Sequence, residues 1–382
     1  MRVTNSMLVS NLRRNLNYSM TRMDKLQNQM ATGRKYAHIS DDPAALIYGQ
    51  SARNKLARLD NYKNTVSTAQ DWLLQAEVGV MELQNTLVNA YELTVDAASD
   101  AKGTRPDSES DKPNIGQVIA QLRDHFVDTL NVTFGDKFVF GGYNTPGDPT
   151  TGTPSDQSIK SFTVEMWTND TGEVVPGLFY NGFNLSRFDN MSLADYTANF
   201  LTPMDPPPGL QDPPNMSDPD TVAYLENQTF QQLAGDILKF DVGTGVTMPV
   251  TMNGIELVLF PTPDENGVMR IRNSWNVLQE LYERTNAGEP AENIGKMITP
   301  LQQGQNHLLT KTAEIGGRTR RLELLEARYT QDAINYERMR SDAEDADMAE
   351  VIMYFKMAEA VHQSALSAGA RVIQPTLMDF LR

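Results

Sequence analysis

Apolar residues recur at both ends of the chain in alternating steps of three and four, the spacing that marks one face of an α-helix. The C-terminal repeat starts at Asp347 and Glu350, which form a capping-box pattern. The N-terminal repeat covers residues 5–32, and Gly33 can end that helix in a left-handed conformation. A narrow apolar stripe needs a partner helix. The sequence therefore predicts that the two ends pair with each other or with other copies of the chain.

Each stripe defines a candidate assembly seam, and we expect both termini to fold fully only when these seams are buried on assembly. Pro375 is expected to end the C-terminal helix. The N-terminal seam consists of Val9, Leu12, Leu16, Met23, Leu26 and Met30. The C-terminal seam consists of Val351, Tyr354, Phe355, Ala358, Val361, Ala365 and Val372.

Seven-residue apolar repeats predict two further long helices. One starts at the cap Ser40-Asp41-Asp42-Pro43 and carries its repeat from Leu59 to Thr94. The other carries its repeat from Leu301 to Ala343 and has only one apolar row. We expect these helices to pack against each other in antiparallel fashion, with a third, shorter helix at residues 114–133.

The period changes after residue 135, where short apolar stretches alternate with turns and favour β-strands. Asn253-Gly254, between apolar segments 246–252 and 255–260, predicts a type I′ hairpin. The predicted fold class is α+β, with a long antiparallel α-helical rod or coiled coil built from both termini and a β-rich central domain. The predicted divisions are a terminal helix and connector at residues 1–42, one half of the rod at residues 43–142, and the central domain at residues 143–265. The other half of the rod follows at residues 270–342, and the C-terminal helix at residues 343–382.

Charge is unevenly distributed along the 382 residues. Residues 101–270 carry 9 basic and 23 acidic side chains, a net charge of −14 out of −16 for the chain, and 16 of the 20 prolines. This composition predicts a solvated, outward-facing central domain that is dispensable for contacts between terminal helices. It also argues against nucleic acid as a partner, because phosphate binding needs a basic face.

Composition and motifs exclude several kinds of chemistry. The chain has no cysteine, so it has no disulfide, thiolate nucleophile or cysteine zinc site. Asp41 and Asp42 are explained as a helix cap, and Gly243-Thr244-Gly245 precedes a strand rather than a helix. We therefore expect no enzyme activity, cofactor or metal. The four histidines are far apart in the sequence: His38, His125, His307 and His362.

Location is predicted from what the chain lacks. Its apolar runs are too short to span a membrane, and its N-terminus lacks the apolar core of a secretory signal peptide. We therefore expect either a cytoplasmic protein or one exported by a route that does not read such a signal.

Motifs at both ends resemble those of the bacterial flagellin superfamily. The N-terminal motif is Met30-Ala31-Thr32-Gly33-Arg34-Lys35 followed by Ser40-Asp41-Asp42-Pro43. The C-terminal motif is Ser341–Asp347, together with the ending Leu377-Met378-Asp379-Phe380-Leu381-Arg382. Asp41-Asp42-Pro43, Phe140-Gly141-Gly142-Tyr143 and the ending are closest to the hook-associated branch of the superfamily. The resemblance covers about residues 1–145 and 270–382.

The resemblance implies a structural protein that polymerises at the distal end of the hook and provides the layer on which the flagellin filament grows. It implies extracellular localisation in the flagellum after type III export without a cleaved signal peptide. The implied partners are copies of the chain itself, a second hook-associated junction protein, the hook protein, flagellin on the distal side, and an export chaperone on the C-terminal helix.

Two other functions stay open. One is flagellin, the bulk subunit of the filament. The other, of a different class, is a secreted coiled-coil tether or adhesin whose central domain binds a ligand. The amount of the protein in purified filaments distinguishes flagellin, which would be the main component, from a junction protein, which would be a minor one. A surface location without flagella would favour the tether or adhesin.

Overall fold

The structure is a computed structural model that describes residues 5–38, 40–99, 111–135, 137–142, 160–169, 171–207 and 219–378. The chain divides into two compact units. Unit 1 comprises Met1–Asn61 and Ala327–Arg382, and unit 2 comprises Tyr62–Glu326. Two long helices, α2 (Pro43–Ala97) and α9 (Ile298–Glu344), contribute to both units. Each unit is described by itself below.

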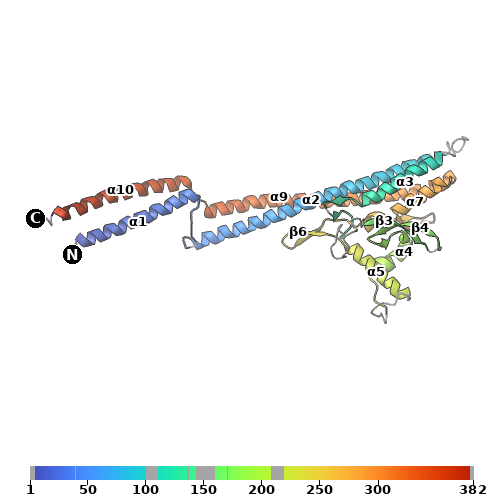
Figure 1. Cartoon of the computed structure of the whole chain (residues 1–382), viewed down its shortest axis with the longest axis horizontal. Helices are drawn as coiled ribbons and strands as arrows, with labels where there is room; N and C mark the ends of the chain where they lie inside the picture. Colours follow the sequence, from blue (N-terminus) through green and yellow to red (C-terminus); the bar gives the residue numbers. More distant parts are fainter. Residues whose placement is uncertain are drawn as a thin grey trace, which may run out of the picture. The chain divides into compact units, whose positions relative to one another are not determined.

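Unit 1 pairs the two ends of the chain. Helix α1 (Asn5–Thr32) lies beside α10 (Met348–Met378), as Figure 1 shows. The predicted N-terminal helix is confirmed, and Gly33 ends it with a φ of +69°. The expected stop at Pro375 is wrong, because α10 continues to Met378. Within a helix a proline removes one backbone hydrogen bond and crowds the carbonyl four residues earlier, which kinks or weakens the helix without always ending it.

In unit 2 the long helices pack antiparallel, as their seven-residue repeats predict. Gln70 of α2 donates to Glu326 of α9 (3.1 Å), and Gln305 of α9 donates to the carbonyl of Leu87 (3.0 Å). Residue numbers therefore increase along α2 in the direction in which they decrease along α9, so the two helices are antiparallel. The contact is apolar and fully buried, with Val66, Leu73, Val80 and Leu87 from α2 and Leu301, Leu308, Ile315 and Leu322 from α9.

Shorter helices extend this arrangement. Helix α3 (Asp111–Leu130) packs against α7 (Ser274–Asn286), where Gly116 lies close to the Thr285 side chain. Helix α8 (Ala291–Gly295) follows α7. Asn273 is the N-cap of α7, and its side chain accepts a hydrogen bond from the amide of Trp275 at 3.0 Å.

In the described part of the chain the strands form four small antiparallel sheets. The largest has the order β3-β4-β5, and its first two strands are paired from Phe162 opposite Tyr180 to Thr168 opposite Val174. The other three are two-stranded hairpins. The strands are β1 (Thr133–Phe134), β2 (Lys137–Phe138), β3 (Phe162–Thr168), β4 (Val174–Tyr180), β5 (Phe183–Asn184), β6 (Lys239–Gly243), β7 (Val246–Pro249), β8 (Leu259–Pro263) and β9 (Met269–Asn273).

The predicted hairpin at Asn253-Gly254 is wrong. Asn253 instead caps helix α6 (Gly254–Val258), accepting a hydrogen bond from the amide of Ile255 at 2.8 Å. Strand β7 pairs with β6, and β8 pairs with β9. Asparagine favours turns and helix caps for the same reason, its short side chain bonding to nearby amides, so the dipeptide alone does not decide between them.

The central region also contains more helix than expected. Helix α5 (Pro219–Gly235) lies in the region where the sequence pattern favours β-strands. Shorter turns are η4 (Ser186–Phe188), α4 (Leu193–Tyr196) and η5 (Thr197–Leu201). These elements bury an aromatic cluster whose rings lie 4.7–6.3 Å apart, formed by Phe183, Phe188, Tyr196, Phe200 and Phe230.

Long helices with small antiparallel sheets in unit 2 confirm the predicted α+β class. The predicted five-part division of the chain stays a prediction. Among the described residues, no helix is both long and apolar enough to cross a bilayer.

Candidate functional site

The two terminal motifs meet in unit 1. The amide of Lys35 donates to the carbonyl of Glu344 at 2.7 Å, and the amide of Ala346 donates to the carbonyl of Gly33 at 2.8 Å. Between them Arg34 and Asp345 form an antiparallel bridge. We call these two segments, Gly33–Lys35 and Glu344–Ala346, the terminal joint. It connects the end of α1 to the turn between α9 and α10.

Side chains on the N-terminal side support the joint. The amide of Gln29 donates to the carbonyl of Lys35 (2.6 Å), and the ammonium of Lys35 donates to the carbonyl of Asp342 (3.2 Å). The hydrogen bond from Lys25 (3.0 Å) lowers the pKa of Asp41, which also accepts hydrogen bonds from the amides of residues 37 and 38. These contacts fix the short connector between α1 and α2.

Helix α2 begins as predicted. Pro43 is its first residue, and the carboxylate of Asp42 accepts a hydrogen bond from the amide of Ala45 at 3.0 Å. At the start of α10 the carboxylate of Asp347 accepts hydrogen bonds from the amides of Ala349 (2.9 Å) and Glu350 (3.3 Å). The predicted N-caps are confirmed at Asp42 and Asp347, and each places an anion at the positive end of a helix.

An ion pair between a buried carboxylate and a partly exposed arginine holds α9 against α2 at the joint. The side chain of Glu344 is only 5% exposed and is paired with Arg53, whose Nε lies 3.2 Å from Oε2. Gly49, one turn before Arg53, leaves the space that the carboxylate fills, since a Cβ there would meet the Glu344 carboxyl group. The other carboxylate oxygen, Oε1, is buried without a hydrogen-bond partner among the described residues. Burial of this carboxylate thus depends on Gly49 and Arg53 together.

The N-terminal seam faces α10 along most of its length. Leu26 is buried against Val351 and Ala358, and Met23, Met30 and Phe355 pack around them. Leu12 and Leu16 are half-buried, whereas Val9 is 41% exposed.

The C-terminal seam meets α1 through one of its two expected rows. Val351, Ala358 and Ala365 form that row, and the neighbouring contact row passes through Phe355 and Gly369. A Cβ on Gly369 would lie 2.7 Å from Leu12 Cδ2, so α10 approaches α1 closely there. The other expected row is exposed in the single chain, with Tyr354 at 37% and Val361 at 57%. The side chain of Val372 lies outside the described residues.

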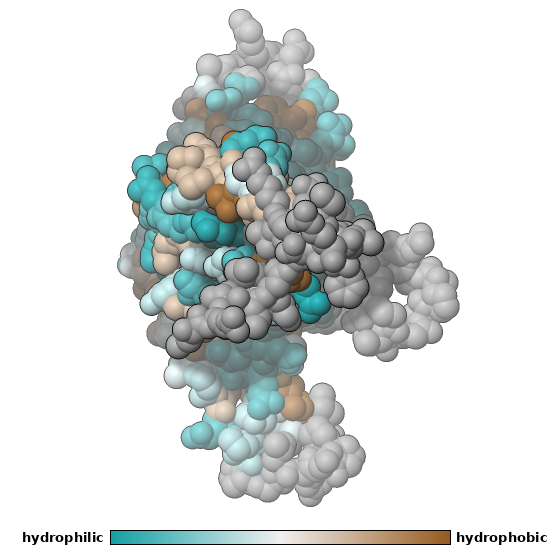
Figure 2. All heavy atoms as spheres, turned by 90° about the vertical axis from the view of Figure 1, so that its left-hand side faces the viewer, coloured by the Kyte–Doolittle hydropathy of each residue, from teal (hydrophilic) through white to brown (hydrophobic). Residues whose placement is uncertain are grey.

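The exposed row gives α10 a second apolar face. Tyr354, Met357 and Val361 form one wall of a groove of about 380 Å³, and Tyr18 and Arg22 of α1 contribute the other. Figure 2, which views the molecule from the left-hand side of Figure 1, shows tan and brown apolar residues among teal hydrophilic ones. A helix with apolar residues around most of its circumference is typically buried on more than one side.

The central glycine motif is structural in unit 2. Gly142 has a φ of +66°, and a Cβ there would lie 2.9 Å from the carbonyl oxygen of Asp236. A Cβ on Gly141 would meet the hydroxyl of Ser161. Gly142 therefore requires glycine for its backbone conformation, and both positions require it because a side chain would not fit.

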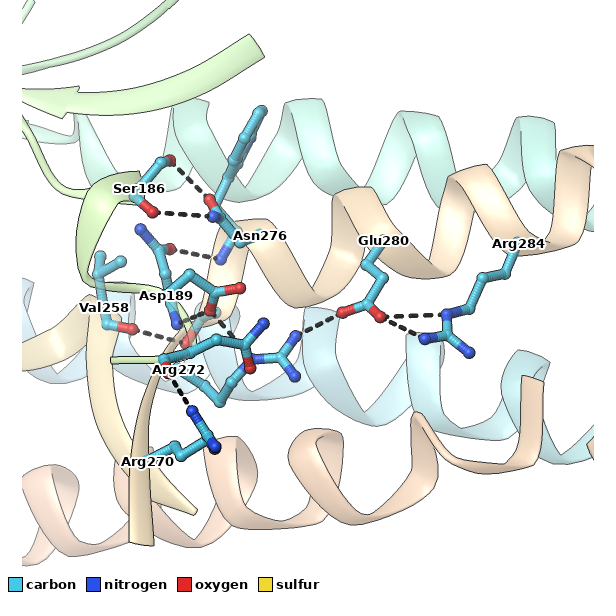
Figure 3. Close-up of polar contacts among 12 residues, drawn as sticks. Ser186, Asp189, Val258, Arg270, Arg272, Asn276, Glu280 and Arg284 are labelled. Atoms are coloured by element: carbon cyan, nitrogen blue, oxygen red, sulfur yellow. Dashed lines mark hydrogen bonds and ion pairs between the residues drawn. The ribbon is translucent and has the colours of Figure 1, made fainter. Parts of the chain in front are cut away.

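A buried polar network joins the central region to α7 (Figure 3). Arg272 donates through Nε to Asp189 (3.0 Å) and through Nη2 to Glu280 (2.5 Å), and Glu280 also accepts from Arg284. Burial acts to raise the pKa of Glu280, but the two arginines lower it. The amide of Asn273 donates to the same oxygen of Asp189 at 2.9 Å. Each charge in this network is paired, which indicates a structural role.

The described part of the chain contains no cluster of three histidine, cysteine, aspartate or glutamate residues that could hold a metal ion. Among the histidines, His125 pairs with Glu82 at 3.0 Å, and His307 lies 2.6 Å from the carbonyl oxygen of Glu256. Neither of these two contacts brings a nucleophile and a base together.

Two functional features were missed from the sequence. The Gly49–Arg53–Glu344 contact joins residues almost 300 positions apart and leaves no local signal. The groove on α1 and α10 depends on which row of α10 faces α1. The exposed apolar residues that form it were visible in the sequence, but their orientation was not.

Comparisons with known proteins agree with the terminal motifs. Residues 3–145 match the model of the bacterial flagellin N-terminal helical region. Over 150 residues the chain is 27% identical to flagellar hook-associated protein 3 of Escherichia coli (strain K12), which covers 39% of this chain and 46% of that protein. The matched segment thus spans about half the length of that relative. The resemblance to the flagellin superfamily is confirmed over this region.

Solved structures show a similar fold. A flagellar hook-associated protein from Vibrio parahaemolyticus superposes with a TM-score of 0.51 at 15% identity, covering 80% of this chain and all of that one. The flagellar junction protein FlgL from Legionella pneumophila superposes with a TM-score of 0.50 at 10% identity, covering 78% of this chain and all of that one. At these identities the likeness concerns the fold alone.

Proposed function

We propose that this chain, whose N-terminal region is similar to the helical region of bacterial flagellins, is a structural subunit of the flagellum. In this proposal it polymerises at the distal end of the hook, as part of the hook–filament junction, and provides the layer on which the flagellin filament grows. It acts without catalysis or a cofactor.

The observation that carries the proposal is the terminal joint. Gly33–Lys35 and Glu344–Ala346 belong to the motifs that resemble flagellin at opposite ends of the chain, and the two segments are hydrogen-bonded to each other. The joint holds α1 and α10 side by side, and α10 still exposes Tyr354, Met357 and Val361. A surface of this kind suits burial against further copies of the chain in a polymer.

The roles of the two seams follow from this arrangement. We propose that Leu12, Leu16, Met23, Leu26 and Met30 pair with Val351, Phe355, Ala358 and Ala365 within one chain, and that Val9, Tyr354 and Val361 contact neighbouring subunits. Further proposed partners are a second hook-associated junction protein, the hook protein and flagellin. An export chaperone is proposed to cover α10 before export through the type III apparatus.

Deletion of the gene tests the proposal. The expected phenotype is a cell with hooks but without filaments that sheds flagellin into the medium, and the intact gene should restore filaments. In purified flagella the protein should be a minor component found at the hook end by immunogold labelling. Its presence as the main filament protein would identify it as flagellin instead. A surface location unrelated to flagella would favour an adhesin.

A further inference from the structure

Strand β3 of unit 2 is the outer strand of the β3-β4-β5 sheet, and it pairs with β4 over its whole length without a register shift. The amide of Asn181 donates to the carbonyl of Ser161 (2.8 Å), which fixes the phase of the ladder. In an antiparallel pair, the backbone groups of alternate residues turn toward the partner strand. Residues 163, 165 and 167 therefore bond to β4, whereas residues 162, 164, 166 and 168 turn their backbone groups away from it.

The first of these outward residues is already paired within the chain. The side chain of Asn131 donates to the carbonyl of Phe162 and accepts from its amide, each at 2.9 Å. The other outward residues are Val164, Met166 and Thr168, and all three are exposed. Their outward amides and carbonyls have no hydrogen-bond partner in the part of the chain that the structure describes. We call this row of backbone groups the β3 edge.

Other sheets in unit 2 carry features that hinder pairing with another chain. Edge strands are commonly protected by prolines, by basic residues or by bulges. Such features are Lys239 and a register shift in β6, Pro249 in β7, Pro261 and Pro263 in β8, and Arg270 and Arg272 in β9. Strand β3 has no proline, no basic residue and no register shift, and its single charge is Glu165. The β3 edge is therefore open to a further strand.

An apolar strip lies beside the β3 edge. Val164 and Met166 project from the same face of the sheet as Phe162, because side chains alternate along a strand. Phe162 and the facing Leu178 are fully buried at one end of this strip. At the other end Val164, Met166 and Val174 are 45%, 64% and 63% exposed. Strand addition uses both features, since the edge supplies hydrogen bonds and the strip supplies contacts between side chains.

We propose that two copies of this chain pair through their β3 edges, antiparallel and around a twofold axis at Met166. Met166 of one copy lies opposite Met166 of the other, and Val164 lies opposite Thr168. The pairing joins two three-stranded sheets into one continuous sheet and merges the two apolar strips on one face. This inference goes beyond the proposed flagellar function and does not depend on it.

Two features of β3 select this register. Centring on Met166 uses the outward groups of Val164, Met166 and Thr168 in both copies and places Glu165 opposite Trp167. A shift of two residues in one direction brings Phe162 into the pairing, although Asn131 already occupies its backbone groups. The same shift sets the two copies of Glu165 directly opposite each other, which is unfavourable. A shift in the other direction leaves Val164 without a partner in the strand.

The properties of the edge favour a second copy of the chain as its occupant. Among identical chains, the matching surface is another β3 edge, because the other described strands longer than two residues are internal or carry the features named above. The Met166 register also keeps the only charged residue of the strand away from its own copy. A twofold contact closes at two copies. The pair is therefore distinct from the head-to-tail contacts of a polymer.

The absence of native cysteine makes cross-linking a direct test. Oxidation of the purified full-length variant Met166→Cys should give a disulfide-linked dimer, because facing Cα atoms of such a pair lie about 5.5 Å apart, within the reach of a disulfide. The matched control is Val174→Cys, which is equally exposed on the same face but belongs to β4. It should remain monomeric. Monomeric Met166→Cys, or an equal dimer from the control, would overturn the proposal.

The register is tested by mixing two single variants. Val164→Cys and Thr168→Cys lie opposite each other in the proposed pair, so an equimolar mixture should form the disulfide-linked dimer. Either variant oxidised alone should form far less, since identical residues then lie about 13 Å apart along the strands. Equal amounts of dimer from the mixture and from the separate variants contradict the proposed pairing.

A proline substitution removes the hydrogen bonds of the β3 edge without touching the ladder to β4. The amide of residue 166 faces outward, so Met166→Pro should preserve the hairpin, with unchanged circular dichroism, and weaken dimerisation about tenfold or more. Met166→Thr keeps the amide and should dimerise like the wild type. Sedimentation velocity over a range of concentrations measures both. A wild-type protein that is monomeric throughout, or that associates no better than Met166→Pro, contradicts the proposal.

Experiments in cells separate the other outcomes. A Met166→Cys chain that cross-links to a different protein, while the purified protein stays monomeric, would assign the β3 edge to that protein and reject pairing between copies. Immunogold labelling remains the test of the proposed function. Dimers through Met166 without labelled hook ends keep the contact and reject the junction role, whereas labelled hook ends with a monomeric purified protein do the reverse.

Discussion

At the scale of single residues, two glycines in long helices should respond in opposite ways to the same substitution. Gly49→Ala would place a methyl group against the buried carboxyl group of Glu344 and displace it from Arg53. Separating a buried carboxylate from its partner costs roughly 3–5 kcal/mol, less if Glu344 swings to water. Hydrogen exchange of residues 30–61 should therefore become faster, which mass spectrometry would measure.

Gly316→Ala is the matched control, because its methyl group would meet nothing within 4 Å. It should stabilise α9 by about 1 kcal/mol through helix propensity alone. Urea unfolding followed by circular dichroism measures this change. A destabilised Gly316→Ala variant, or a Gly49→Ala variant with wild-type exchange, would contradict the packing described for these sites.

His307 should make unit 2 sensitive to mild acid. Burial lowers its pKa, although the hydrogen bond with the carbonyl of Glu256 acts in the opposite direction. The unfolded chain then binds a proton more readily than the folded one, so stability falls as pH decreases through about 6.5, the ordinary histidine value. His307→Gln should reduce the loss of unfolding free energy between about pH 7 and 5.5.

Glu280 should act in a lower pH window. The charges of Arg272 and Arg284 lower the pKa of Glu280 against the effect of burial. The ionised carboxylate therefore stabilises the fold at pH values above its pKa in the unfolded chain, and this stabilisation is lost as pH falls through its pKa in the folded chain. Glu280→Gln should therefore flatten the stability profile below about pH 4.5 and lower stability at neutral pH. Identical profiles for the variants of His307 and Glu280 would show that these groups do not titrate separately.

At the scale of elements, α10 presents two apolar faces with different roles. Ala358→Asp places a carboxylate against Leu26 and Val351, where burial without a partner costs several kcal/mol. Val361→Asp places the same charge on the exposed face. In the purified protein, amides of α1 and α10 should exchange faster in Ala358→Asp and at the wild-type rate in Val361→Asp.

The two variants should differ again in cells. Val361→Asp should be exported yet fail to enter the hook end, because its charge lies on the surface proposed to contact neighbours. If the termini fold only on assembly, wild-type α1 and α10 will already exchange quickly in the monomer. Normal assembly of Val361→Asp would instead show that this face of α10 is not an intersubunit surface.

At the scale of the whole molecule, the acidic central region is tied to the rest of unit 2. Phe162 packs against Gly254 and exchanges two backbone hydrogen bonds with the side chain of Asn131, each 2.9 Å long. Asp189 pairs with the buried Arg272. Composition alone predicts a dispensable outer module, whereas these contacts make it part of the core.

Replacing residues 145–235 with a short Gly/Ser linker should therefore destabilise unit 2, because Arg272 loses one of its partners and Gly254 is uncovered. Thermal unfolding and protease resistance measure the effect. A matched deletion confined to residues 209–217 removes none of these contacts and should leave both unchanged. A stable protein after the larger deletion would restore the view of the central region as a separate module.

The sequence by itself determined the helices at both ends, their caps at Asp42 and Asp347, and the left-handed stop at Gly33. These features depend on hydrogen bonds and side-chain spacing within a few residues, so local patterns are sufficient to predict them. The heptad rows of α2 and α9 also predicted their mutual packing, because each helix has one continuous apolar row that must be buried.

Only the tertiary structure decided which strands pair, that Asn253 caps a helix, and which row of α10 faces α1. Strand pairing joins distant segments, and α10 is apolar around most of its circumference, so periodicity leaves more than one orientation open. The contact of Gly49 and Arg53 with Glu344 has the same origin. Its residues are ordinary in the sequence, and only the fold brings the carboxylate into a space that the missing Cβ leaves free.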